Sequence, residues 1–518
     1  MTPTAPLTLG DVAQLLFAVT LPPEHATRPI TNTGVDSRAI KPGDFFVGLS
    51  GERTDGNLYL KAAFAAGAVG ALAEDRMFET LENVLCVWPD GAMQARGGES
   101  GQAAGPAHTP VLFVVPDALR ALQALGAAWR QTLPVVTIGI TGSVGKSTTK
   151  ETVANVLATR YVTLRSEGNY NNEIGLPLTL LRLRRQHERA VLEMGMYAIG
   201  EIKQLCEWAR PRVGVVTNVG PVHLARLGAI ERIAQAKSEL PVALPPAEDG
   251  GVAILNRDDP LVWAMAGITQ ARVFSYGLHP ESDLWADQIE SEGLEGIRFR
   301  CHYAGNAYHI HLPLLGRHSV HTALRAVAVG LTDNLSWDEI VHGLQDVRGQ
   351  LRLMVVPGLR ETTLIDDTYN ASPDSTLAAL NLLRDISNSS HRAIAVLGDM
   401  YELGAYEQAG HRLVGGRAAQ VVNKLIAVGQ RARWIAEEAL AVGMNTADVY
   451  PVDTNTDAIG ILQGLIRPGD VVLIKGSRAA GMEVIVDALS RREGGPALGP
   501  KASGTRTPHG GAPLRGEA

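Results

Sequence analysis

Short apolar runs alternate with longer segments of mixed polarity through the middle of this chain of 518 residues. Residues 135–140, 190–193 and 213–217 are almost entirely apolar, as is typical of parallel strands that are covered on both faces. Residues 252–255 and 272–276 predict two further strands, and segments of helical length separate the runs. The pattern therefore predicts a doubly wound, mainly parallel α/β sheet.

A different pattern follows this sheet. Residues 297–303 and 308–314 predict an antiparallel addition to it, and residues 316–331 predict a helix. We expect these segments to complete a central domain at residues 133–348.

The alternation also occurs before the central domain. Within residues 1–132 the pattern predicts helices at 9–17 and 58–68, a strand–turn–strand unit at 33–47 and a strand at 111–115. We therefore expect a small N-terminal α/β domain.

Residues 349–490 repeat the theme after the central domain. Four apolar runs separated by helical segments predict an open Rossmann-like sheet, with strands at 363–366, 393–397, 425–428 and 470–474. The fold class is thus α/β in each of the three parts.

Two segments lack the composition of a packed domain. Residues 90–110 are rich in Gly, Ala and polar residues, and residues 491–518 are rich in Gly and Pro. We expect the first to be a flexible, exposed insertion and the second to be a disordered tail.

Composition and charge exclude some classes of function for this protein. The net charge of -7 and the pI near 6.1 argue against a nucleic-acid partner, which calls for a basic surface. The three cysteines, Cys86, Cys206 and Cys301, have neither metal-site spacing nor the number for a disulfide framework. The chain shows no signal leader and no apolar run long enough for a transmembrane segment, so we expect a cytoplasmic protein.

A polar turn follows the first strand of the central sheet and precedes a predicted helix. Glycines at 142 and 145 let backbone N–H groups approach a polyphosphate, and the helix N-terminus favours an anion. Lys146 would reach the β- and γ-phosphates, and the Ser147 hydroxyl would bind Mg²⁺. Ile140 stands where the common form of this loop has its first glycine, so the loop is a variant. We predict a nucleotide-triphosphate loop, in preference to a tight turn with a chance lysine, formed by Gly142, Ser143, Val144, Gly145, Lys146, Ser147 and Thr148.

Polar residues follow other strands at the edge where open parallel sheets bind ligands. Glu193 closes a strand beside the loop and is well placed to hold Mg²⁺. His223 falls at the same edge, although a single loop histidine means little by itself. Lys237 lies on a helix with a mostly apolar side, a pattern that favours a surface lysine whose stem covers apolar neighbours. Further polar turns, whose chemistry the pattern does not name, occur at residues 256–260, 366–373 and 475–478.

Taken together, these motifs resemble the ATP-dependent Mur ligases of peptidoglycan synthesis, and within them the MurF branch. The resemblance covers about residues 30–485 and keeps the family's motif order. Its most specific pieces are Thr141-Gly-Ser-Val-Gly-Lys-Ser147, Gly168-Asn-Tyr-Asn-Asn-Glu-Ile-Gly-Leu-Pro177, Asp366-Asp-Thr-Tyr-Asn-Ala-Ser-Pro373, Gly398-Asp-Met-Tyr-Glu-Leu-Gly404 and Lys475-Gly-Ser-Arg478.

The resemblance implies a reaction and a three-domain architecture: a UDP-substrate-binding domain, an ATP-binding domain and a Rossmann-like domain. A UDP-N-acetylmuramoyl-tripeptide carboxylate would attack the γ-phosphate of ATP, and the amine of D-alanyl-D-alanine would then displace phosphate from the acyl phosphate. Ser147 and Glu193 would serve one Mg²⁺, and His223 with Lys237 a second. In the family this lysine is carbamylated, which reverses the interpretation of Lys237 as a surface residue. A monomer is expected.

The resemblance also implies positions for the substrates. Asn256 would lie near adenine, Asp367 near the ribose, and Ser37 and Arg38 near the uridine. Asn171 and Asn172 would lie close to the muramoyl substrate. The remaining substrate-binding positions are Tyr369, Asn370, Lys475, Ser477 and Arg478.

The chain departs from the family pattern at three places. The family commonly has Gly-Arg before the last domain, whereas this chain has Gln350 and then Arg352. Either Arg352 reaches the phosphates from a shifted register, or that contact is missing. The family usually has asparagines where Ser319 and His321 stand, and threonine where Ser147 stands.

Two rival functions remain. A folylpolyglutamate synthase or cyanophycin-type ligase would share the central domain but lack the uridine-binding domain. The Asp36-Ser-Arg38 turn and the motif from Asp366 to Pro373 argue against this rival. A non-catalytic nucleotide-binding scaffold is the other, and the presence of Lys146, Glu193, His223 and Lys237 argues against it.

Overall fold

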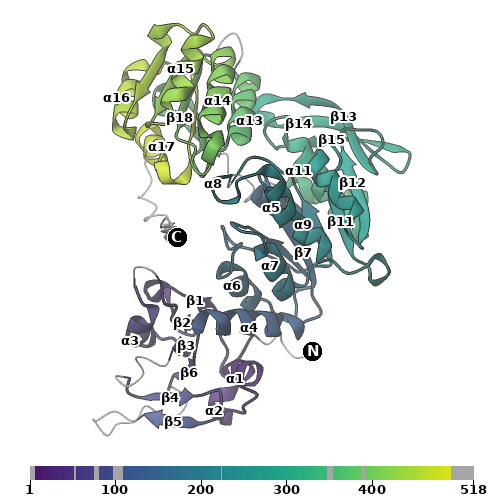
Figure 1. The fold of residues 1–518 in the computed structure, drawn as a ribbon, viewed down its shortest axis with the longest axis vertical. Coiled ribbons are helices and arrows are strands. Elements are labelled where there is room, and N and C mark those ends of the chain that lie inside the picture. Colours follow the sequence, from purple (N-terminus) through teal and green to yellow (C-terminus); the bar gives the residue numbers. More distant parts are fainter. Residues whose placement is uncertain are drawn as a thin grey trace, which may run out of the picture. The chain divides into compact units, whose positions relative to one another are not determined.

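A computed structural model describes residues 6–51, 54–74, 81–96, 109–222, 224–346, 354–387 and 391–491. The chain forms three sheets (Figure 1) and divides into one unit at residues 7–121 and another at residues 122–491. This boundary falls inside helix α4 (Ala118–Gln131), about ten residues before the predicted one. The predicted boundary at residue 348 lies outside the described residues and stays a prediction.

The first unit is built on a six-stranded sheet in the order β1-β2-β3-β6-β4-β5. All pairs are parallel except β4–β5, and strands β3, β4 and β6 are almost wholly buried. Its strands are β1 (Thr33–Gly34), β2 (Phe45–Val47), β3 (Gly70–Glu74), β4 (Val84–Val87), β5 (Met93–Arg96) and β6 (Val111–Val115), and its first helices are α1 (Leu9–Phe17), α2 (Pro23–Ala26) and α3 (Leu60–Ala65).

The flexible insertion predicted at residues 90–110 needs a correction. Residues 93–96 form the edge strand β5, largely exposed and hydrogen-bonded to β4, because backbone pairing needs no apolar side chains. Residues 97–108 lie outside the described residues. The helix predicted at 58–68 is also shorter, since a 3₁₀ turn at Gly56–Tyr59 precedes α3.

The second sheet has nine strands in the order β15-β14-β13-β12-β11-β10-β7-β9-β8. Strands β7 to β13 pair in parallel and β13, β14 and β15 are antiparallel, so the predicted antiparallel addition is continuous with the parallel sheet. The strands are β7 (Val136–Thr141), β8 (Thr163–Arg165), β9 (Arg189–Glu193), β10 (Val213–Val216), β11 (Val252–Asn256), β12 (Arg272–Gly277), β13 (Leu284–Ser291), β14 (Ile297–Tyr303) and β15 (Asn306–Leu312).

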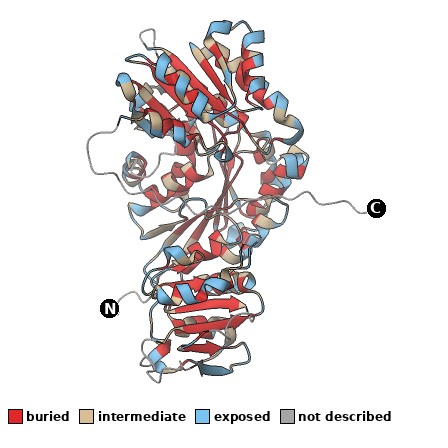
Figure 2. Ribbon diagram, turned by 90° about the vertical axis from the view of Figure 1, so that its left-hand side faces the viewer, coloured by how far each residue is buried: buried red, intermediate tan, exposed pale blue. Residues whose placement is uncertain are grey.

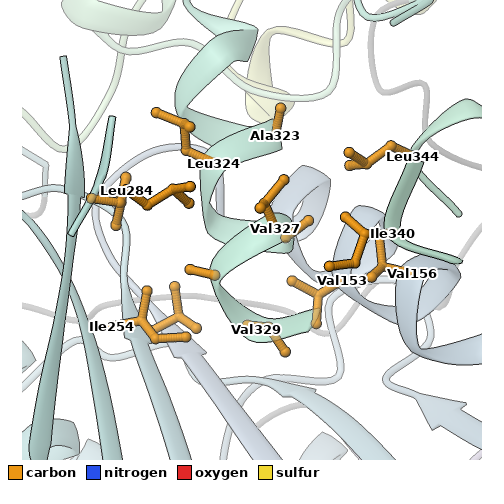
Figure 3. Packing of buried hydrophobic residues seen from close by; sticks show 14 of the residues in the cluster. Val153, Val156, Ile254, Leu284, Ala323, Leu324, Val327, Val329, Ile340 and Leu344 are labelled. Atoms are coloured by element: carbon orange, nitrogen blue, oxygen red, sulfur yellow. The ribbon is translucent and has the colours of Figure 1, made fainter. Parts of the chain in front are cut away.

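Helices cover both faces of this sheet. On one face, α11 (Ser319–Thr332) lies among side chains of α5 (Lys146–Ala158), of α12 (Trp337–Gln345) and of strands such as β11 and β13 (Figure 3). On the other face, Gly139 of β7 lets Leu240 of α9 (Ile230–Val242) approach closely. The remaining helices are α6 (Gly175–Leu181), α7 (Glu201–Ala209), α8 (Leu224–Leu227) and α10 (Pro260–Trp263).

The third sheet has six strands in the order β16-β17-β21-β18-β19-β20, parallel except for β16–β17. Its buried strands lie between helices whose outward faces are exposed (Figure 2). Its strands are β16 (Met354–Pro357), β17 (Thr363–Asp367), β18 (Ala393–Gly398), β19 (Lys424–Val428), β20 (Val449–Val452) and β21 (Val471–Lys475), and its helices are α13 (Pro373–Ile386), α14 (Glu407–Val421), α15 (Arg433–Ala441), α16 (Asn455–Leu465) and α17 (Glu483–Leu489).

No helix in the described part of the chain combines the length and the apolar composition needed to cross a membrane.

Candidate active site

The predicted phosphate loop joins β7 to α5. Gly142 and Gly145 have φ angles of +143° and +83°, which favour glycine. A Cβ on Gly142 would lie 1.8 Å from Oγ1 of Thr217, so this position also has no room for a side chain. The loop therefore exposes backbone N–H groups at the start of a helix, as a polyphosphate site requires.

The turn after β10 holds the loop in place. The Val144 N–H donates to Oδ1 of Asn218 at 2.9 Å, and the Thr217 hydroxyl donates to the Val144 carbonyl at 2.7 Å. The Ser143 N–H donates to the Asn218 carbonyl at 2.9 Å. Asn218 is thus a supporting residue that the sequence showed only as part of a polar turn.

Ser147 and Glu193 lie in direct contact. Strands β7 and β9 pair in parallel with Ile140 opposite Glu193, so the end of β9 lies beside the loop. The Ser147 hydroxyl donates to Oε2 of Glu193, and Nδ2 of Asn171 donates to Oε1 at 2.8 Å. Glu193 is only 2% exposed. A buried hydroxyl and carboxylate in contact are an oxygen donor set that suits Mg²⁺.

Lys237 contradicts the interpretation that its helix pattern favoured. It is not a surface lysine: only 2% of it is exposed, because its turn of α9 faces the sheet. Burial, and then the charge of nearby Lys146, hold the pKa of Lys237 well below its ordinary value. Among the described residues its amino group has no hydrogen-bond or ion-pair partner, so no group there stabilises the charged ammonium form.

The other lysine of this pair, Lys146, lies over the loop. Its Nζ donates to the carbonyl of Gly142 at 2.8 Å. His223, the remaining predicted metal ligand, lies outside the described residues. Within the described ranges, no three His, Cys, Asp or Glu side chains cluster as a metal site.

A second group of predicted residues gathers at the carboxyl edge of the third sheet. Strands β17 and β21 pair in parallel with Asp367 opposite Lys475. Nζ of Lys475 donates to Oδ2 of Asp367 at 2.6 Å and to the Asn370 carbonyl at 2.8 Å. Next to them, the Arg478 guanidinium lies 5.2 Å from the centre of the Tyr369 ring.

Ser477 connects this cluster to the loop after β18. Its hydroxyl donates to the Ala371 carbonyl at 3.3 Å and accepts from the Tyr401 N–H at 3.0 Å. Asp367, Asn370 and Lys475 therefore form one hydrogen-bonded cluster. Ser477 lies next to it through its bond to Ala371.

The adenine-site candidates lie at the ends of β11 and α11. The Asn256 side chain donates to the Thr217 carbonyl at 3.4 Å and accepts from the Asp258 N–H at 3.1 Å. Nε2 of His321 pairs with Oδ2 of Asp258 at 2.7 Å, so the residue that departs from the family pattern contacts the Asn256 turn. Ser319 instead bonds back to the Leu315 carbonyl at 2.7 Å.

Three predicted substrate residues have local partners. The Arg38 guanidinium pairs with Asp36 at 2.7 Å on the surface of the first unit, and Ser37 begins the same 3₁₀ turn. Oδ1 of Asn172 accepts from the Gly175 N–H at 2.9 Å, at the start of α6. Arg352 and Gln350 lie outside the described residues.

Comparison with protein families identifies two regions of the chain. Residues 140–330 match the Mur ligase middle domain, and residues 351–478 match the Mur ligase, glutamate ligase domain.

Whole-chain relatives agree with this result. The UDP-N-acetylmuramoyl-tripeptide--D-alanyl-D-alanine ligase of Mycobacterium tuberculosis (strain CDC 1551 / Oshkosh) is 36% identical, over 93% of this chain and 97% of the relative. The crystal structure of MurF from Acinetobacter baumannii aligns with a TM-score of 0.77 at 30% identity, covering 94% of this chain and 99% of that one. The structure of MurF ligase from Thermotoga maritima in complex with ADP has the same fold, with a TM-score of 0.70 at 24% identity over 88% and 96% of the two chains.

Proposed function

Because this chain belongs to the Mur ligase family, we propose that it is an ATP-dependent ligase that joins D-alanyl-D-alanine to UDP-N-acetylmuramoyl-tripeptide. The products would be UDP-N-acetylmuramoyl-pentapeptide, ADP and phosphate, in the synthesis of peptidoglycan precursors. The observation that carries the proposal is the Ser147–Glu193 contact beneath a glycine-rich loop that ends in Lys146. The ADP in the Thermotoga maritima relative supports the choice of nucleotide.

The first step joins two anions, which repel each other in water. An oxygen of the tripeptide carboxylate attacks the γ-phosphorus of ATP, the bond from that phosphorus to the bridging oxygen breaks, and ADP leaves. Lys146 and the N-terminus of α5 place positive charge where negative charge accumulates in the transition state. Asn218 and Thr217 fix the loop at Ser143 and Val144. The backbone N–H groups that follow, at Gly145 and the start of α5, would hold the phosphates in position.

Ser147 and Glu193 fit a magnesium ion, since both offer buried oxygen atoms at the loop. Asn171 would fix the orientation of the carboxylate. A bound Mg²⁺ would supply charge neutralisation of the triphosphate. Ser147, Glu193 and, at a second ion, His223 with Lys237 would hold the metal.

Lys237 would act as a carbamate. Its neutral amine would attack CO₂, a C–N bond would form and one proton would leave, which gives a carbamate anion. Support comes from its burial, its lack of a partner among the described residues and its depressed pKa beside Lys146. The new anion would balance the charge of Lys146 and offer oxygen to a second cation.

The second step forms the amide. The amine nitrogen of D-alanyl-D-alanine attacks the acyl-phosphate carbon, the carbon–oxygen bond to phosphate breaks, and the amine loses a proton. We assign the cluster at the ends of β17 and β21 to substrate binding because its polar side chains converge at the ligand-facing edge. The assigned residues are Tyr369, Asn370, Lys475, Ser477 and Arg478, with Asp367 at the ATP ribose.

The remaining assignments follow the family pattern. Asn256 would lie at adenine, Arg352 at the phosphates, Ser37 and Arg38 at the uridine, and Asn171 with Asn172 at the muramoyl group. The protein would act as a monomer of three domains in the cytoplasm, for which its three buried free thiols are suited.

Phosphate release by the purified protein tests the proposal. The assay contains ATP, Mg²⁺ and UDP-N-acetylmuramoyl-tripeptide, with D-alanyl-D-alanine added or omitted. We expect release that requires both substrates, its loss in Lys146→Ala, and wild-type rates in Lys203→Ala, which alters an exposed lysine of α7. Bound ATP without release would contradict the proposal, and a panel of other carboxylates and amines would then separate another amide ligase from a scaffold.

A further inference from the structure

Arg325 is a buried charge in an otherwise apolar position. It lies on α11 beside Leu324 and two residues before Val327, which pack in the core of the second sheet (Figure 3). Only 4% of Arg325 is exposed. A buried arginine is costly unless its charge is compensated, so a specific partner is expected.

The contacts of Arg325 are all neutral. Its Nη1 donates to Oγ1 of Thr149 at 2.5 Å, and its Nε donates to the His321 carbonyl at 2.9 Å. The Tyr276 ring lies 5.9 Å from the guanidinium carbon, and burial raises the pKa of this phenol to about 12, so it carries no charge. The guanidinium of Arg325 thus has hydrogen-bond partners, but none of these partners carries a negative charge.

No carboxylate in the described part of the chain lies within ion-pair distance of Arg325. Asp258, an acid close to Tyr276, instead pairs with His321 and accepts from the Leu278 N–H at 2.8 Å. Burial accordingly lowers the pKa of Arg325, although an arginine stays charged at any working pH.

The guanidinium lies directly behind the phosphate loop. A Cβ on Gly145 would be 3.3 Å from Nη1 of Arg325, and Thr149, its hydrogen-bond partner, is in the first turn after the loop. The uncompensated cation is therefore next to the place where a polyphosphate would bring negative charge.

We propose that Arg325 is a positioning residue that balances the charge of the bound nucleotide from behind the loop. It can do so because its guanidinium lies beside Gly145 and Thr149. This inference rests on the proposed ATP site. Low dielectric makes such a charge effective over several ångströms without direct contact. The interaction grows with each phosphate and does not depend on the base.

The test compares two substitutions. Arg325→Met keeps much of the volume and removes the charge, whereas Arg325→Lys keeps the charge. Arg130→Met is the matched control, because Arg130 also bonds only to neutral groups, Thr137 at 2.9 Å and the Ala209 carbonyl at 3.0 Å, near the other end of β7. Calorimetry measures the binding of adenosine, AMP, ADP and ATP to each full-length protein, and thermal denaturation is measured without nucleotide.

We expect Arg325→Met to weaken ATP binding about tenfold or more, with smaller losses for ADP and AMP and none for adenosine. Its melting temperature without nucleotide should be unchanged or higher, because an uncompensated buried charge has been removed. Arg325→Lys should keep most of the ATP affinity, and Arg130→Met should keep all of it.

Three results would overturn the inference. The first is an equal loss of affinity for adenosine and ATP. The second is an Arg325→Met protein that is less stable or unfolded without nucleotide, which would make Arg325 a structural residue. The third is an unchanged ATP affinity in Arg325→Met. Wild-type protein that binds no ATP would count against the proposed function, whereas wild-type and Arg325→Met proteins with the same ATP affinity would count against the inference alone.

Discussion

The Ser147 hydroxyl at the start of α5 donates a hydrogen bond to Oε2 of Glu193 at the end of β9. The two residues are 46 positions apart in the chain and meet because β7 and β9 are neighbouring parallel strands. Their contact puts a carboxylate within reach of the phosphate loop. This arrangement depends on strand pairing and not on the local sequence around either residue.

Removing the hydroxyl should weaken magnesium binding. We expect Ser147→Ala to raise the Mg²⁺ concentration needed for half-maximal ATP turnover by about tenfold or more, because one oxygen ligand is lost. Ser147→Thr keeps the hydroxyl and is the matched control. A Mg²⁺ titration of phosphate release measures both, and an alanine variant with the wild-type titration curve would remove Ser147 from the metal site.

Asn171 and Asn172 should differ in their effects although they are neighbours. Asn171→Ala removes the hydrogen bond to Oε1 of Glu193, so we expect about a tenfold weaker response to Mg²⁺. Asn172→Ala removes an acceptor at the start of α6 and should lower the free energy of unfolding by about 1 kcal/mol, with the Mg²⁺ response unchanged. Equal Mg²⁺ titrations for the two variants would show that Asn171 does not orient the carboxylate.

Lys237→Ala should abolish turnover, and short carboxylates such as acetate should restore part of it by replacing the carbamate anion. Lys203→Ala is the exposed-lysine control. An independent readout is the carbamate carbon signal in NMR spectra recorded with ¹³C-labelled bicarbonate, present in the wild type and absent in Lys237→Ala. An active Lys237→Ala protein, or a wild type without that signal, would contradict the carbamate.

The sequence predicted elements best where apolar runs are long. Strands β6 and β14 have the predicted bounds, β9 and β10 differ from them by one residue at one end, and β7 is shifted by one residue at both ends. Strand β13 was not predicted, because polar residues interrupt its apolar run from Asp287 onward and only Leu284 and Trp285 pair with β12. Strand β20 was missed because it is a short edge strand that contains Pro451.

In the candidate site, too, the sequence predicted the features that contiguous residues form and missed those that depend on packing. The loop, with its glycines and Lys146, is visible in the sequence because contiguous residues form it. The burial of Lys237 and the burial of Arg325 depend on how helices pack on the sheet. Periodicity therefore gave the wrong environment for the first and no signal for the second. Asn218 is similar, since only the pairing of β10 with β7 makes it a support of the loop.

Lys475 and Asp367 should be coupled energetically. Lys475→Met leaves Asp367 without its cation in a largely buried place, so we expect the free energy of unfolding to fall by about 3 kcal/mol or more. Asp367→Asn should also destabilise, and the double variant should lose less than the sum of the two, by about 1 kcal/mol or more. Urea unfolding followed by circular dichroism gives these values, and additive losses would show that the pair is not a unit.

His411 should make stability depend on pH. It is fully buried, its Nδ1 donates to the Glu407 carbonyl at 2.7 Å, and its Nε2 accepts from the Met400 N–H at 3.0 Å. Burial lowers the pKa of His411, and the Met400 bond needs an unprotonated Nε2. The neutral ring thus holds the loop that follows β18.

The direction of this pH dependence follows from when the folded and the unfolded chain bind a proton at His411. As the pH falls through about 6.5, His411 gains a proton in the unfolded chain but not in the folded one, so its contribution to stability decreases until the lower folded pKa is reached. We expect the melting temperature to fall between pH 8 and pH 5.5 and the fall to be shallower in His411→Gln. That variant should be less stable by about 1 kcal/mol at pH 8, because a buried hydrogen bond is weakened. His309→Gln, which alters an exposed histidine of β15, should keep the wild-type slope, and an identical slope in His411→Gln would assign the pH dependence to other groups.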